Sequence, residues 1–214
     1  MILTVVTLAA AVPLRADGHR AADIAAQAGA PRPSTPESLS EPTPKQRATR
    51  LYFSDRELVT QHGEKVAFYS DVLRDKVVLV NFIFTKCTDS CPMQTARLAV
   101  VQSLLPDATK LGIELVSISV DPEHDTPQAL EEYAARFGAH DGWTFLTGSK
   151  ANVEDVLRRL GQLAPSRESH TTLFMLGNVQ SGHWIKLHPD SDPADIARYL
   201  RSLAAESMKP DATN

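Results

Sequence analysis

The stretch "KVVLVNFIFTKCTDSCPMQTARLAVVQSLL" (residues 76–105) decides how this chain folds. Its first part, 76–84, is a nearly continuous run of apolar, β-branched and aromatic residues, which is typical of a strand buried on both faces. Pro92 then suits the first position of a helix. The apolar residues after it predict that helix's buried face: Met93, Ala96, Leu98, Val100, Val101, Leu104 and Leu105. The chain's two cysteines, Cys87 and Cys91, therefore fall in the turn between a central strand and the next helix.

Segments on either side complete the fold prediction. Alternating apolar residues around "QHGE" predict a β-hairpin at 56–68. Downstream, the patterns predict a buried strand at 112–120, a helix capped by Asp125 or Thr126 that ends at Gly138, a short strand at 143–148, a helix after Ser149, a hairpin of 171–177 with 182–188, and a closing helix from Pro193. This order predicts parallel crossover strands followed by an antiparallel pair. We therefore expect an α/β, thioredoxin-like fold with an N-terminal β-hairpin extension.

Composition divides the chain into four parts. Residues 1–16 contain an apolar run too short to span a bilayer, so we expect a signal peptide or a membrane-proximal apolar segment. Residues 17–48 are rich in Ala, Pro and Ser and predict a disordered tether. Residues 49–206 have the size of one domain, and 207–214 form a polar tail. The net charge of −4 and the lack of a dense basic run argue against a nucleic-acid partner.

The cysteine pair has three interpretations. As a structural disulfide it would close a very small loop, where the entropic gain is least. As a redox couple it would profit from the helix N-terminus, which lowers thiol pKa values, and from nearby Lys86. Against a thioredoxin-type enzyme, three residues separate the cysteines and no proline precedes the strand at 171–176. Val80, seven residues before Cys87, does not fit a peroxidase motif. As a metal site, two thiolates favour Cu(I) or zinc and need a third ligand.

His170 is the candidate for that third ligand. It stands immediately before a predicted buried strand. In a thioredoxin-like fold, this loop passes over the turn that holds the cysteines. The remaining histidines fall in the tether, in turns and in polar loops or the last hairpin: His19, His62, His124, His140, His183 and His188.

Four blocks in order, "FIFTKCTDSCPMQ", "VSISVDPEHDTPQALEEYAARFG", "WTFLTG" and then His170, resemble the Sco/SenC copper chaperones of cytochrome oxidase assembly. The resemblance covers roughly residues 50–203. It implies that Cys87, Cys91 and His170 bind copper as Cu(I) or Cu(II), and that an adjoining loop includes the following residues: Asp121, Pro122, Asp125 and Thr126. Ser169 departs from the family pattern, which typically has an aspartate there, and the nearest carboxylate is one position further back, at Glu168.

The resemblance implies a copper metallochaperone rather than an enzyme. Its acceptor would be the dinuclear copper site of cytochrome c oxidase subunit II, or a similar periplasmic cuproenzyme, whose thiol state it could also maintain. An upstream copper donor, a monomeric state, and a periplasmic or membrane-anchored, periplasm-facing location are expected with it. The competing hypothesis is a periplasmic thiol-disulfide oxidoreductase that uses Cys87 and Cys91 as its redox pair. A binding module with an incidental disulfide is the third class.

Overall fold

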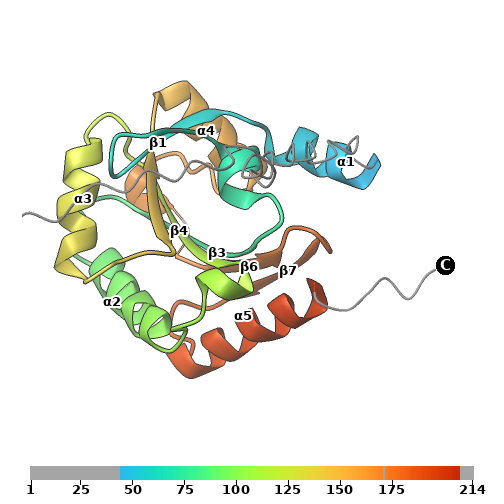
Figure 1. The fold of residues 1–214 in the computed structure, drawn as a ribbon. Helices are drawn as coiled ribbons and strands as arrows, with labels where there is room; N and C mark the ends of the chain where they lie inside the picture. Colours follow the sequence, from blue (N-terminus) through green and yellow to red (C-terminus); the bar gives the residue numbers. More distant parts are fainter. Residues whose placement is uncertain (1–43, 171, 208–214) are drawn as a thin grey trace, which may run out of the picture. The chain divides into compact units, whose positions relative to one another are not determined.

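The computed structural model describes residues 44–170 and 172–207 (Figure 1). The expected apolar segment at 1–16, most of the expected tether and most of the polar tail lie outside these residues. In chain order the elements are α1 (Pro44–Phe53), β1 (Glu57–Thr60), β2 (Lys65–Ala67), the π-helical turn η1 (Phe68–Leu73), β3 (Val77–Ile83), α2 (Ser90–Ser103), the 3-10 turn η2 (Thr109–Leu111), β4 (Ile113–Ser119), α3 (Pro127–Arg136), β5 (Trp143–Thr147), α4 (Lys150–Arg159), the 3-10 turn η3 (Arg167–Ser169), β6 (Phe174–Asn178), β7 (His183–Leu187) and α5 (Pro193–Ser207).

One seven-stranded sheet joins all the strands in the order β2-β1-β5-β4-β3-β6-β7. Strands β3, β4 and β5 run parallel, with Val77 opposite Ile113 and Leu115 opposite Trp143. Strands β6 and β7 form an antiparallel hairpin, and β6 pairs antiparallel with β3. The expected parallel crossovers and closing antiparallel pair are thus confirmed, and with them the thioredoxin-like fold.

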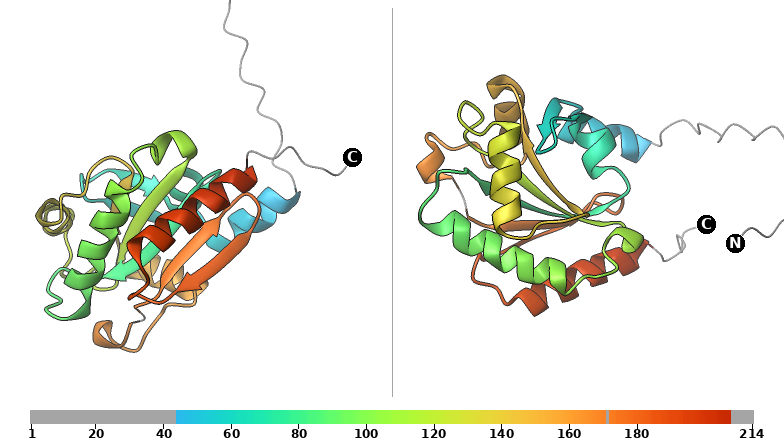
Figure 2. Two further views of the ribbon diagram at one scale, coloured as in Figure 1. Left: turned by 90° about the horizontal axis from the view of Figure 1, so that it is seen from below. Right: turned by 60° about the vertical axis from the view of Figure 1, so that its left-hand side comes forward.

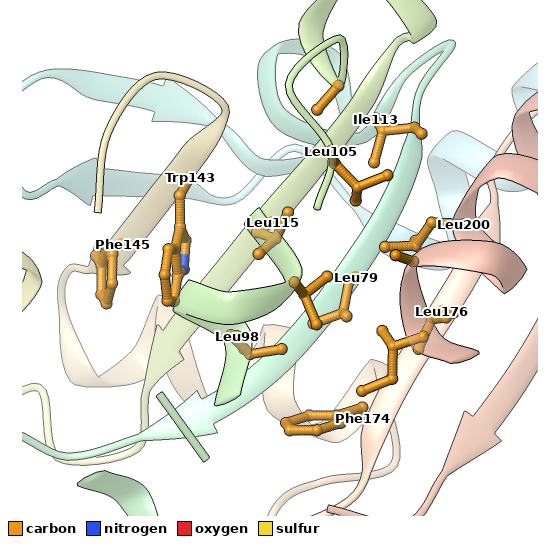
Figure 3. Packing of buried hydrophobic residues seen from close by; sticks show 14 of the residues in the cluster. Leu79, Leu98, Leu105, Ile113, Leu115, Trp143, Phe145, Phe174, Leu176 and Leu200 are labelled. Atoms are coloured by element: carbon orange, nitrogen blue, oxygen red, sulfur yellow. The ribbon is translucent and has the colours of Figure 1, made fainter. Parts of the chain in front are cut away.

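Helices cover both faces of the sheet, which explains why every residue of β3 is buried. Alternate β3 residues point to opposite sides, because side chains alternate along a strand. Leu79 joins the core under α2, α3 and α5, whereas Val80 joins the core under α1, η1 and α4. Figure 2 shows the two helical layers, and Figure 3 shows Leu98 of α2 and Leu200 of α5 converging on the sheet.

The N-terminal part differs from the expectation in two ways. Helix α1 begins at Pro44, so residues 44–48 are helical instead of tether. Its last residue, Phe53, is buried, and its ring lies 5.4 Å from that of Trp184 on β7. The predicted hairpin at 56–68 is confirmed as β1 and β2, but it extends the main sheet, because β1 pairs with β5. Within residues 44–170 and 172–207, no helix has the length and apolar character needed to cross a bilayer.

The predicted buried face of α2 is partly wrong. Met93, Val100 and Leu104 are exposed, by 67%, 48% and 38%, and Ala96 is exposed as well. Three polar residues are buried on this helix beside its apolar core residues: Gln94, Thr95 and Gln102.

Candidate metal centre

The cysteines lie where β3 leads into α2, but not in equivalent positions. Helix α2 begins at Ser90, so Cys91 is its second residue, whereas Cys87 precedes it in the connecting loop. Pro92, predicted to be the first helical residue, is the third. A proline is tolerated there because the first-turn N–H groups have no intrahelical acceptor. Both thiols are free; Cys91 is fully buried and Cys87 is half-buried.

The two thiols have opposite electrostatic environments. Burial raises the pKa of Cys91 to about 12, and its hydrogen bond with Cys87 adds to this shift. Burial by itself also raises the pKa of Cys87. Hydrogen bonds from the Cys91 thiol and from the backbone N–H groups of Asp89 and Cys91 outweigh that effect and lower it. The pair therefore favours a thiolate at Cys87 and a thiol at Cys91.

His170 lies beside this pair. Its Nε2 is 4.0 Å from Sγ of Cys91, its ring packs in a T-shaped arrangement with that of Phe84, and the residue is 8% exposed. The Nδ1 atom is hydrogen-bonded to the carbonyl oxygen of Arg167. A carbonyl can only accept, so Nδ1 carries a proton, and in the neutral imidazole the lone pair of Nε2 faces the cysteine. The approach of His170 to the cysteine turn, expected from topology, is present.

The spacing of this sulfur and nitrogen suits a shared metal ion. With metal–sulfur and metal–nitrogen bonds of about 2.3 and 2.0 Å, two such ligands lie between about 3.5 and 4.3 Å apart. In residues 44–170 and 172–207, however, no three His, Cys, Asp or Glu side chains are yet gathered closely enough to hold an ion. A complete set of Cys87, Cys91 and His170 therefore requires these side chains to move closer together.

The loop between β4 and α3 holds the cysteine loop through Asp125. This carboxylate is 1% exposed and accepts hydrogen bonds from the Thr85 N–H at 3.1 Å, the Thr85 hydroxyl at 2.6 Å and the Ser119 hydroxyl at 2.6 Å. The cap of α3 is Thr126, whose hydroxyl accepts from the N–H of Ala129. Because Thr85 is two residues before Cys87, Asp125 anchors the cysteine loop to the end of β4.

The same β4–α3 loop holds the histidine loop through Asp121. Its carboxylate forms an ion pair with Arg167, whose guanidinium lies over the ring of Phe84, and it also contacts Nδ1 of His124 at 2.8 Å. Burial by itself raises the pKa of Asp121. The hydrogen bonds from His124 and Arg167 and the charge of Arg167 outweigh burial, so the pKa lies below its usual value. Arg167 was missed in the sequence. Its signal is its position three residues before His170, because η3 begins at Arg167 and His170 directly follows its last residue.

The sequence of this chain is similar to those of known proteins. The model of the SCO1/SenC family matches residues 44–205. This chain belongs to the SCO1/SenC family. The SCO2-like protein of Rickettsia conorii is 38% identical over 158 residues, which cover 69% of this chain and 75% of the relative. The SCO1 homologue of Bacillus subtilis is 39% identical over 97 residues, and the matched part spans 49% of that relative's length and 44% of this chain.

Solved Sco structures share the fold. ScoI of Bradyrhizobium japonicum, determined with copper bound, is 26% identical and has a TM-score of 0.58, with 70% of this chain and 98% of ScoI covered. BsSco, described as a member of the Sco family of cytochrome c oxidase assembly proteins with a disulfide switch, is 28% identical with a TM-score of 0.60. The match covers 72% of this chain and 93% of BsSco.

In this SCO1/SenC chain, the Ser169 side chain forms hydrogen bonds within its own turn. The Ser169 hydroxyl accepts from the N–H of Ser166 at 3.2 Å and donates to its carbonyl oxygen at 3.0 Å, which closes the η3 turn. The side chain at this position therefore caps a turn and supplies no negative charge beside His170.

The other histidines lie elsewhere. His19 is outside the described residues. Three of those described have carboxylate neighbours away from the cysteines: His62 with Glu131, His183 with Glu206, and His188 with Asp190. Among the described histidines, the one in contact with a cysteine sulfur is His170.

Proposed function

We propose that this SCO1/SenC protein binds one copper ion through Cys87, Cys91 and His170. The observation that carries the proposal is Nε2 of His170 at 4.0 Å from the Cys91 sulfur, with Nδ1 donating to the Arg167 carbonyl. Two thiolate donors and one imidazole suit Cu(I) as a three-coordinate ion, and Cu(II) with one added ligand. The copper-bound ScoI structure supports this choice of metal.

The ion is proposed as cargo rather than a resident cofactor. Cys87 is half-buried, so an acceptor's ligand can displace it first, before Cys91 and His170 release the ion. Family membership and the description of BsSco support delivery to the dinuclear copper site of cytochrome c oxidase subunit II, or to a similar cuproenzyme. We propose a location in the periplasm or anchored to the membrane and facing the periplasm, and a Bacillus anthracis relative described as a lipoprotein supports the anchored form. An upstream copper donor and a monomeric state belong to the same proposal.

The copper stoichiometry of the reduced, anaerobically purified protein tests this function. We expect one copper ion per chain. Cys→Ala changes at 87 or 91 should cost more Cu(I) affinity than His170→Ala, since thiolates provide the soft, negatively charged donors. His170→Ala should act most strongly on Cu(II), while His183→Ala and His188→Ala serve as controls. A parent-like His170→Ala combined with a defective control variant would refute the ligand assignment.

A second candidate function is reduction of an acceptor's disulfide. The lowered pKa of Cys87 and the raised pKa of Cys91 favour it, as does the disulfide switch described for BsSco. The Cys87 thiolate would attack the acceptor disulfide and form a mixed disulfide. Cys91, after losing its proton, would then release the acceptor as a dithiol and leave a Cys87–Cys91 disulfide. His170→Ala separates the functions, because it should abolish Cu(II) binding and leave dithiol reduction largely intact.

A further inference from the structure

A pocket of about 480 Å³ adjoins His170, and a second imidazole, that of His124, lies on its wall. His124 belongs to the loop between β4 and α3, and its side chain is 51% exposed. His170, by contrast, is 8% exposed. The pocket is therefore lined by one imidazole that solvent reaches readily and one that belongs to the interior.

Hydrogen bonding leaves the outer imidazole with a free lone pair. Nδ1 of His124 lies 2.8 Å from a carboxylate oxygen of Asp121. An ionised carboxylate only accepts, so Nδ1 carries a proton, and in the neutral imidazole Nε2 is the nitrogen with the lone pair. Histidines that bind metals commonly donate their other N–H to a carboxylate in this way, which fixes the ring and raises the basicity of the ligand nitrogen. The ion pair with Arg167 holds Asp121 in turn.

The charge of the pocket wall favours a cation. Three carboxylates line it, from Asp121, Glu123 and Glu154, against the two cations of Lys150 and Arg167. Both cations are paired with carboxylates of the same wall: Arg167 with Asp121, and Lys150 with Glu123 at 3.1 Å. A surplus of negative charge in a concave site raises the local concentration of cations.

We propose that copper first binds transiently to His124 in this pocket and is then transferred to His170. This inference rests on the copper binding proposed above. The transfer is a ligand exchange, in which the bond to the His170 nitrogen forms as the bond to the His124 nitrogen breaks, and the ion keeps its oxidation state. His124 is therefore not one of the three ligands of the main copper site, and it affects the rate at which that site is loaded with copper.

His183 provides a matched control. Its Nδ1 lies 3.0 Å from Glu206, and its side chain is 52% exposed, so its pairing and exposure resemble those of His124. It lies on β7 and is not among the residues that line the pocket. Asn is the suitable replacement at both positions, because its amide N–H can still donate to the carboxylate but offers no basic nitrogen.

Stopped-flow loading of the reduced, full-length protein with substoichiometric Cu(II) tests the inference. Absorption of the copper–thiolate bond reports filling of the main site. We expect His124→Asn to slow loading about tenfold, the low end of gains from local concentration, with equilibrium affinity within about twofold of the parent. His183→Asn should load at the parent rate.

Three results would overturn the role of His124: parent-rate loading by His124→Asn, equal slowing by His183→Asn, or a parallel loss of affinity, which would indicate a structural effect through Asp121. A parent that binds no copper would refute the proposed function as well, whereas a parent that loads normally leaves that function standing.

A second measurement isolates the transient site. In a Cys87→Ser/Cys91→Ser/His170→Ala variant, the electron paramagnetic resonance spectrum of one added Cu(II) should show a single imidazole nitrogen. His124→Asn should remove that signal and His183→Asn should keep it. An unchanged spectrum in the His124→Asn background would contradict the inference.

Discussion

Replacing Asp125 by Asn tests whether the β4–α3 loop fixes the cysteine loop. The buried carboxylate accepts from the N–H and hydroxyl of Thr85 and from the hydroxyl of Ser119. Asn keeps the shape but has one acceptor oxygen instead of two, so its amide N–H groups face at least one donor. Because Thr85 is close in sequence to Cys87, we expect lower stability together with a looser cysteine loop.

The expected loss of stability in Asp125→Asn follows from the strengths of these hydrogen bonds. A hydrogen bond to a charged group contributes about 1.5–3 kcal/mol, and a neutral one about 0.5–1.5 kcal/mol. Weakening three such bonds by about 1–1.5 kcal/mol each should lower the free energy of unfolding of Asp125→Asn by about 3–4.5 kcal/mol, which urea denaturation measures. The thiol of Cys91, fully buried in the parent, should react with an aromatic disulfide reagent at least about tenfold faster, because local opening becomes more frequent.

Asp55→Asn is the matched control. Asp55 accepts from the N–H and hydroxyl of Ser70 at 2.8 and 2.9 Å, the same donor types that Thr85 presents to Asp125. The Asp55→Asn variant should lose stability without exposing Cys91. Both variants are compared at urea concentrations well below their unfolding midpoints. Our reasoning fails if Asp125→Asn leaves Cys91 as unreactive as in the parent, or if Asp55→Asn exposes it equally.

Three further predictions concern the cysteines and the packing of β6 and β7. In brief alkylation near pH 7.5, Cys87 should be labelled before Cys91, because its pKa is lowered and its thiol is partly exposed; peptide mass spectrometry would contradict this if both were labelled together. Phe53→Ala should cost about 3 kcal/mol, measured by urea denaturation, since the ring is buried against Trp184. Gly177→Ala should cost about 3 kcal/mol and shift Trp184 fluorescence, because the added methyl would lie 2.3 Å from the Trp184 ring; a parent-like melting curve would show that the ring moves freely.

Much of the fold could be predicted because its signals are local and apolar. The residues of β3 are buried on both faces, as a continuous apolar run requires, and Thr126 and Ser149 cap α3 and α4 at positions expected from sequence. Helix α1 was missed because, among its side chains that the structure describes, Phe53 is the buried one, while Leu51 and Tyr52 are exposed. The sequence of this helix therefore offers little apolar periodicity to recognise.

The errors on α2 have a different physical reason. Apolar periodicity assumes that polar side chains face water, yet Thr95 bonds to Tyr133 and Gln102 to the carbonyl oxygens of His140 and Asp141, inside the protein. The pairing of Arg167 with Asp121 is equally absent from local sequence patterns, because the two residues are 46 positions apart. Such pairings arise from tertiary packing, which no local pattern encodes.

The contact between Cys91 and His170 spans 79 positions of the chain. Any ion held by both residues is a reversible cross-link across roughly half of the folded region. In a chain-entropy view, fixing a loop of this size restricts an unfolded chain by about 4–5 kcal/mol. An unfolded chain keeps its two nearby thiols but loses the distant imidazole, so the third donor exists only while the sheet is intact. Occupancy by such an ion and integrity of the fold are therefore thermodynamically linked.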